Sequence, residues 1–160
     1  VVLTENLPTG FGGTATPLLG GSTFHNIDSL TGSTVPGGGA NDSLTGLADN
    51  AAWEVIGLNR YSNPGPDIDP NHFLTFTAFE NLNGSTLGAF VDIFRLTGAP
   101  QTVNLAGNAG DDQFIVVGNS GVNGTVSGGD GIDTFDLSGR AGNQSINIST
   151  LNSIVAWPAP

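Results

Sequence analysis

The chain has 160 residues, with 14 acidic side chains, 3 basic ones (all arginine) and no cysteine. Its net charge of −11 at pH 7 argues against nucleic acids and anionic membranes as partners, and the lack of cysteine excludes disulfides, a thiol nucleophile and cysteine-ligated zinc. No apolar run reaches the roughly 20 residues that span a bilayer, so membrane insertion is not expected.

Residues 1–23, rich in Gly, Thr, Pro and Leu, predict an irregular lead-in or a cap. Residues 59–72 hold three prolines without a strand pattern and predict a projecting loop, and residues 158–160 predict a tail. The 25 glycines and 9 prolines leave little room for helices, whereas the short alternating runs between them indicate strands. The predicted strands cover residues 74–79, 91–96, 102–105, 113–117, 134–137, 145–148 and 153–157.

Two internal repeats organise the chain. Residues 24–34 and 76–86 share the pattern F-x-x-[apolar]-[acid]-x-L-x-G-S-T at an offset of 52, and residues 107–114 align with 128–135 at an offset of 21. A period near 20 residues is typical of solenoids, in which successive coils pair strand to strand in parallel. We therefore expect an all-β, right-handed parallel β-solenoid with Gly/Asp-rich turns over residues 24–157. Phe114 and Phe135 should then stack in its interior.

Residues 128–136 read G-G-D-G-I-D-T-F-D and match the nonapeptide G-G-x-G-x-D-x-U-x at every defined position, U being a large apolar residue. This segment resembles the haemolysin-type calcium-binding (RTX) repeats of secreted bacterial proteins. Residues 107–115 and 37–45 are imperfect copies. The longer pattern L-T-G…W-x-[I/V]-x-G…F-x-x-F-E-N-L-x-G is similar to large repetitive bacterial surface proteins of the adhesin kind. These resemblances imply a β-helix or β-roll-like fold and an extracellular or cell-surface location.

The RTX resemblance also implies calcium sites, because an aspartate of one turn and carbonyls of the next share a Ca²⁺ in that family. The spacing of 21 residues, in place of 18, predicts a few isolated sites and no continuous row. The alternative is that these aspartates hold backbone N–H groups in Asx-type turns without any metal. The candidate metal ligands are Asp111, Asp112, Asp130 and Asp133, followed by Asp42 and Asp92.

Two further segments have a functional and a purely structural interpretation. Asp28 and Glu80 in the long repeat could be ligands, but the apolar spacing around them favours a strand buried on one face. In the 59–72 loop, Asp67 and Asp69 could act as a carboxylate pair with Arg60 or His72 nearby, although such insertions are often only decoration. We assign no catalytic residue. Asparagines are expected in turns or in ladders between coils.

We expect a calcium-stabilised extracellular structural or adhesive protein without enzymatic activity, forming a segment or subunit of a bacterial surface fibre, adhesin or surface layer. Its expected partners are copies of itself or neighbouring repeats, joined head to tail, and possible surface carbohydrate. The first alternative is a calcium-binding accessory module of a secreted polysaccharide-active or proteolytic enzyme. The second is a carbohydrate- or ice-binding face built from Thr/Asn ladders.

Overall fold

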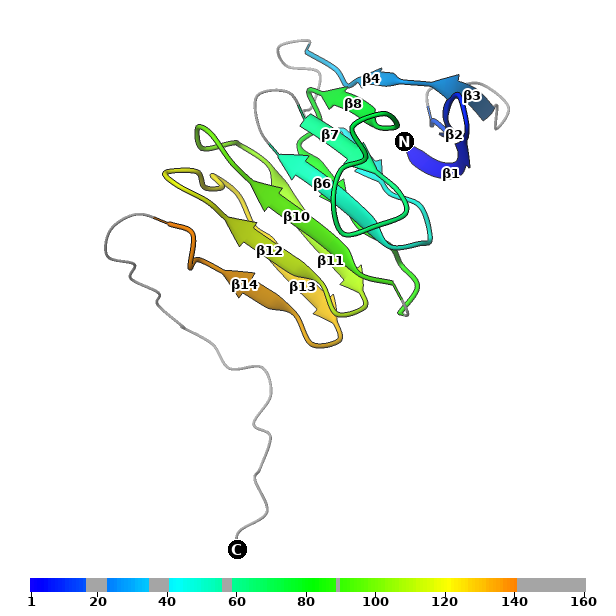
Figure 1. The fold of residues 1–160 in the computed structure, drawn as a ribbon. Coiled ribbons are helices and arrows are strands. Elements are labelled where there is room, and N and C mark those ends of the chain that lie inside the picture. Colours follow the sequence, from blue (N-terminus) through cyan, green and yellow to red (C-terminus); the bar gives the residue numbers. More distant parts are fainter. Residues whose placement is uncertain (17–22, 35–40, 56–58, 89, 141–160) are drawn as a thin grey trace, which may run out of the picture.

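The computed structural model describes residues 1–16, 23–34, 41–55, 59–88 and 90–140. These residues form two seven-stranded sheets that lie one over the other (Figure 1). In the first sheet the order is β13 (Val126–Asp130), β11 (Asn104–Ala109), β9 (Asn81–Asn83), β5 (Ser43–Thr45), β1 (Val2–Leu7), β2 (Gly10–Thr14) and β3 (Thr23–Ile27). In the second sheet it is β14 (Thr134–Asp136), β12 (Gln113–Val116), β10 (Asp92–Leu96), β6 (Ala51–Val55), β7 (Asn59–Ser62), β8 (Leu74–Thr77) and β4 (Ser29–Thr31).

The all-β class is as expected, but the prediction of a right-handed parallel β-solenoid is wrong. Both sheets are open and mix parallel with antiparallel pairs, the latter being β1–β2, β2–β3, β6–β7 and β7–β8. Instead of an irregular lead-in, residues 2–14 form a β-hairpin. The start of the expected loop forms β7, which lies between β6 and β8. Between β1 and β2 only Pro8 and Thr9 connect the strands, and so short a connection permits only antiparallel pairing.

The end of the molecule that contains β9 to β14 is parallel. β9, β11 and β13 pair in parallel in the first sheet, as do β10, β12 and β14 in the second. Leu105 faces Val126 and Phe114 faces Phe135, so the predicted offset of 21 residues is the true register here. In Figure 1, β10, β12 and β14 run side by side in one direction. We call this part the parallel end.

The 52-residue repeat does not correspond to equivalent positions in the fold. Phe24 lies in β3 of the first sheet, whereas its counterpart Phe76 lies in β8 of the second. The core interpretation of the repeat is confirmed for Phe76 and Leu82, each 1% exposed. Phe24 and Leu30 are partly buried and pack against the same core. Similar sequences are therefore buried in both copies, but against different neighbours.

A stack of aromatic rings runs through the core from one strand of the second sheet to the next. The ring of Trp53 lies parallel to that of Phe94, with centroids 5.3 Å apart, and Phe94 lies parallel to Phe114 at 5.1 Å. The three residues are successive Cα partners in the sheet. Phe135 is the next partner in this row but is 52% exposed. The apolar core is thus complete at Phe94 and incomplete at Phe135.

Candidate functional site: an aspartate column

Three aspartates occupy the same position in successive turns that lead from the first sheet to the second. Asp92 begins β10, and Asp112 and Asp133 immediately precede β12 and β14. The parallel register places the following residues opposite one another, with Ile93 facing Gln113 and Gln113 facing Thr134. The parallel pairing therefore aligns Asp92, Asp112 and Asp133 in one column, which we call the aspartate column.

Each carboxylate in the aspartate column accepts hydrogen bonds from backbone groups of the protein. Asp133 Oδ1 accepts from the backbone N–H of Asp112 (3.0 Å), and Asp112 Oδ1 accepts from that of Asp92 (2.8 Å). Asp92 accepts from the indole Nε1–H of Trp53 (2.8 Å) and from the backbone N–H of Ser85 (2.7 Å). The side chains therefore link neighbouring layers, which is the backbone-holding role of the metal-free alternative.

A glycine lies against each carboxylate of the column. A Cβ atom on Gly84 would lie 2.5 Å from Asp92 Oδ2, and one on Gly107 would lie 2.1 Å from Asp112 Oδ2. The corresponding distance from Gly128 to Asp133 Oδ2 is 2.0 Å. Real Cβ atoms do not approach oxygen so closely, so these glycines are required by the close approach of the carboxylates.

Burial makes the negative charges of the column costly. Asp92 and Asp112 are both 0% exposed. Desolvation, with a smaller contribution from the charge of Asp112, raises the pKa of Asp92 to about 6 despite the opposing hydrogen bonds from Ser85 and Trp53. Burial also raises the pKa of Asp112; the hydrogen bond from Asp92 lowers it, and Asp133 and Asp111 raise it. A proton or a cation would relieve this repulsion.

The remaining candidate ligands make other contacts. Asp111 is exposed, and its Oδ1 accepts from the backbone N–H of Ile132 (2.8 Å). Asp130 is an exposed residue of β13 whose carbonyl accepts from Gly110 N. Asp42 lies just before β5, where its carboxylate accepts from the backbone N–H of Ser33. The structure therefore gathers three of the six predicted ligands into one column and gives the other three separate roles.

The described residues contain no group of three or more His, Cys, Asp or Glu side chains placed to hold a metal ion. One observation nevertheless fits a cation: Asp112 Oδ2 is buried and has no hydrogen-bond partner. An unpartnered carboxylate oxygen in the interior is unfavourable unless it is protonated or bound to a cation. Asp112 is therefore the side chain of the column whose buried charge would gain most from a proton or a cation.

Sequence reasoning missed Trp53, Ser85 and Gly84 as partners of the column, and it did not foresee that Gly107 and Gly128 lie against the carboxylates. A signal was present for part of this set. Gly107 and Gly128 precede Asp112 and Asp133 at the same distance, and the Gly84-Ser85 pair precedes Asp92. Nothing in the local sequence connects Trp53 with Asp92, because their contact depends on how β6 pairs with β10.

Arg60 and Asp67 line a cavity on the second sheet, while His72 stacks on Phe11 and lines a different cavity beside Phe73. Trp53 is fully buried. In the described part of the chain, no helix is long and apolar enough to cross a membrane. No protein-family model matches the chain, and no curated protein or solved structure is significantly similar to it.

Proposed function

We propose that this chain is a structural and adhesive module of an extracellular bacterial surface protein, stabilised by Ca²⁺ at the aspartate column. The observation that carries the proposal is the fully buried carboxylate of Asp112, which has one oxygen without a partner and two other aspartates in the same column. The RTX-like nonapeptide at residues 128–136, which contains Asp133, supports the same interpretation.

Asp112 and Asp133 are the side chains that would hold the ion, and backbone carbonyls of the glycine turns would supply further oxygens. Calcium accepts six to eight oxygen ligands in irregular geometry, so two carboxylates with several carbonyls suffice. Bound there, Ca²⁺ would neutralise buried like charges and tie β12 to β14. It would therefore act on stability and take no part in a reaction.

The exposed face of the parallel end supports a role in assembly. Among the described residues, β13 and β14 are the last strands in the order of the two sheets. The strands predicted at residues 145–148 and 153–157 lie outside the described residues. Phe135 is 52% exposed and Ile132 80% exposed, although Phe114, the neighbour of Phe135, is fully buried. A strand edge that has no partner among the described residues, beside exposed apolar side chains, favours the addition of another strand. A further parallel layer, from a neighbouring repeat or a second copy, would complete the aromatic stack.

The other two expected functions receive less support. An enzyme would need Arg60, Asp67, Asp69 and His72 in one groove, but Arg60 and Asp67 line a different cavity from His72. A binding face of Thr/Asn ladders would need regular outward threonines on several consecutive strands. Asn104 of β11 donates to Asn81 Oδ1 of β9 (3.0 Å), but this pair contains no threonine. Thr31 faces Thr77 across β4 and β8, and their hydroxyls are 3.3 Å apart. This pairing involves only two of the described strands.

Thermal melting with and without calcium tests the proposal. Saturating Ca²⁺ should raise the melting temperature of the chain by about 5 to 10 °C relative to EGTA, since a ligand at a hundred times its Kd adds about 2.7 kcal/mol. The Asp112→Asn variant should lose this response, because amide nitrogen replaces the unpartnered oxygen. Asp69→Asn removes the same charge from the distant loop and should keep the response. Equal melting temperatures in Ca²⁺ and EGTA would refute the calcium proposal.

A further inference from the structure

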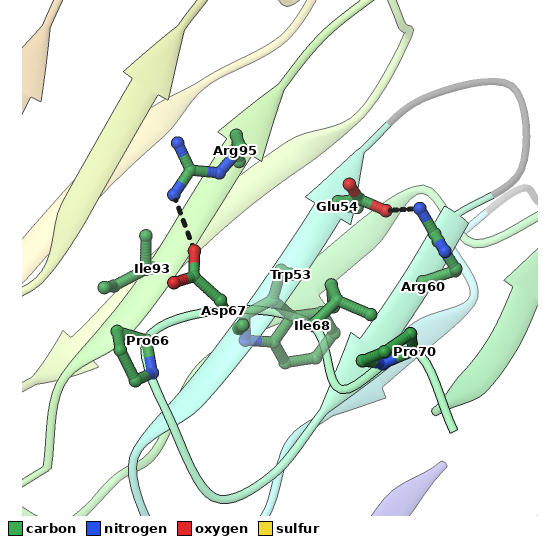
Figure 2. Close-up of a pocket in the computed structure, with 10 residues that line it drawn as sticks. Trp53, Glu54, Arg60, Pro66, Asp67, Ile68, Pro70, Ile93 and Arg95 are labelled. Atoms are coloured by element: carbon green, nitrogen blue, oxygen red, sulfur yellow. Dashed lines mark hydrogen bonds and ion pairs between the residues drawn. The ribbon is translucent and has the colours of Figure 1, made fainter. Parts of the chain in front are cut away.

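A cavity of about 340 Å³ lies on the outer face of the second sheet, between that sheet and the proline-rich segment that follows β7. Figure 2 shows this segment passing over β6 and β10, so that Asp67 and Ile68 face side chains of the sheet. The residues that line the cavity include Glu54, Arg60, Asp67, Ile68, Ile93 and Arg95. A volume of this size is within the range of small-molecule sites.

Two of the chain's three arginines converge on this cavity. Arg95 of β10 and Glu54 of β6 are Cα partners, and Glu54 is in turn the partner of Arg60 of β7. The sheet therefore presents a row of charges in the order positive, negative, positive. Glu54 forms an ion pair with Arg60. Asp67 adds a second negative charge beside Arg95, at 3.2 Å from Nη2, and makes the total charge of the site zero.

The two ends of the site differ in the contacts and the exposure of their charged side chains. At one end the Arg60 guanidinium lies over the ring of Phe73, 5.3 Å from its centroid, and is held by Glu54. At the other end the Asp67 side chain is 79% exposed and that of Arg95 is 37% exposed. Exposed ion pairs of this kind contribute about 0 to 1 kcal/mol, so a ligand can replace the contact between Arg95 and Asp67 at little cost.

The proline-rich segment is fixed to the sheet at its base. Ser62 at the end of β7 donates its hydroxyl to the carbonyl of His72 (3.1 Å) and accepts from the backbone N–H of Asp69 (3.1 Å). Asp69 Oδ1 accepts from the backbone N–H of Asn71 (2.8 Å). These bonds order the segment before any ligand arrives, which lowers the entropy that binding would cost.

We propose that this cavity binds a neutral saccharide unit. Alternating arginine and carboxylate groups can donate to and accept from adjacent hydroxyls of one sugar ring, since each hydroxyl is both donor and acceptor. Ile68 and Ile93 offer an apolar contact for the C–H groups of the ring. A neutral ligand is favoured over an acidic one because the site has no net charge and the whole chain carries −11.

This inference rests on the adhesive part of the proposed function and names its ligand class, but it does not depend on calcium. Isothermal titration in EGTA separates the two proposals. The probes are trisaccharides of glucose, mannose and galactose, with trigalacturonate as the acidic counterpart. We expect at least one neutral trisaccharide to bind with Kd below about 10 mM, and trigalacturonate to bind more weakly.

Two variants tie binding to the cavity. Arg95→Gln should weaken the binding of that trisaccharide by about tenfold or more, because it removes charged donors from the site. Arg140→Gln removes the same charge outside the cavity and should leave the affinity unchanged, with melting curves showing that both variants fold. The proposal is overturned if all neutral probes fail to bind, if trigalacturonate binds best, or if both variants weaken binding equally.

Discussion

At the parallel end, each described strand pair from β9 to β14 is parallel, whereas β1, β2 and β3 at the other end pair antiparallel. Both ends contribute to one hydrophobic core. They differ in how the chain passes between sheets. At the parallel end every connection crosses between the two sheets. The aspartate column joins the three crossings that lead from the first sheet to the second, through two hydrogen bonds.

This difference shows what the polar groups are needed for. A hairpin such as β1–β2 satisfies its backbone with its own neighbouring strand, and its register follows from the turn. In a parallel crossing the chain does not pair with its own preceding strand, so some backbone N–H groups of the turn need another acceptor. Asp112 and Asp133 accept from two of them, and glycines make room for the carboxylates. Parallel stacking thus comes with buried negative charge, which the antiparallel end does not require.

The largest expected effect is at the aromatic stack that joins the two ends. Phe94 is 0% exposed and lies parallel to both Trp53 and Phe114. Phe94→Ala should lower the free energy of unfolding by about 3 to 5 kcal/mol, because it removes a large buried ring and leaves a cavity. Urea denaturation measures this loss.

Phe135→Ala is the matched control, since Phe135 occupies the same row at the open face. Because this ring is 52% exposed, its removal should cost about 1 kcal/mol in the isolated chain. A loss as large as that of Phe94→Ala would mean that Phe135 is covered in solution. The comparison between a closed core and an open end would then be wrong.

A smaller effect is expected where glycine meets the aspartate column. A Cβ on Gly107 would lie 2.1 Å from Asp112 Oδ2 and 2.7 Å from the carbonyl oxygen of Gly128. Gly107→Ala should therefore displace the buried carboxylate and destabilise the fold by about 2 to 3 kcal/mol. Gly88→Ala is the control, because a Cβ there meets nothing within 4 Å. Equal stability of the two variants would show that the column tolerates a methyl group and is not tightly packed.

The sequence predicted the parallel end better than the rest. Phe114 and Phe135 could be aligned because the glycines and aspartates that precede them recur at the same offset of 21 residues. The repeat of Phe24 and Phe76 gave the wrong topology, because apolar spacing specifies burial but not which strand will be the neighbour. The hairpin from Val2 to Thr14 had only the turn residues Pro8, Thr9 and Gly10 as a local signal, because residues 2–7 do not alternate between apolar and polar side chains.

The two candidate sites also differ in how much of each could be predicted from the local sequence. Asp112 and Asp133 were found from a local motif, and holding backbone N–H groups was one of the two roles expected for them. The burial of Asp112 and the identity of the N–H groups depend on the register and could not be foreseen. The saccharide cavity could not be read from sequence, because Glu54 and Arg95 meet only through the pairing of β6 with β10. The segment that closes the cavity was predicted to project from the fold, and instead it folds back over the sheet.

The smallest expected effect is a dependence of stability on pH that arises at Asp92. Its pKa is raised to about 6 in the folded protein, above its ordinary value of 3.8. The folded state therefore binds a proton more tightly than the unfolded state. The resulting stability is fully present below the ordinary pKa and is lost as the pH rises through 6. In EGTA, lowering the pH from about 7.5 to about 5 should raise the free energy of unfolding by roughly 1 to 1.5 kcal/mol.

Asp112 acts in the same direction, because its pKa is also raised. Asp136 acts in the opposite direction, because the hydroxyl and backbone N–H of Ser138 lower its pKa. Its contribution changes only near and below about pH 4, outside this range.

Denaturation of the chain and of Asp92→Asn from about pH 5 to about pH 7.5 isolates the effect of Asp92, since the stability of the variant should depend less on pH. Saturating Ca²⁺ should also weaken this pH dependence, because a cation at the column favours the ionised carboxylates. A stability that falls from about pH 7.5 to about pH 5 would mean that the buried aspartates are already paired with positive charge.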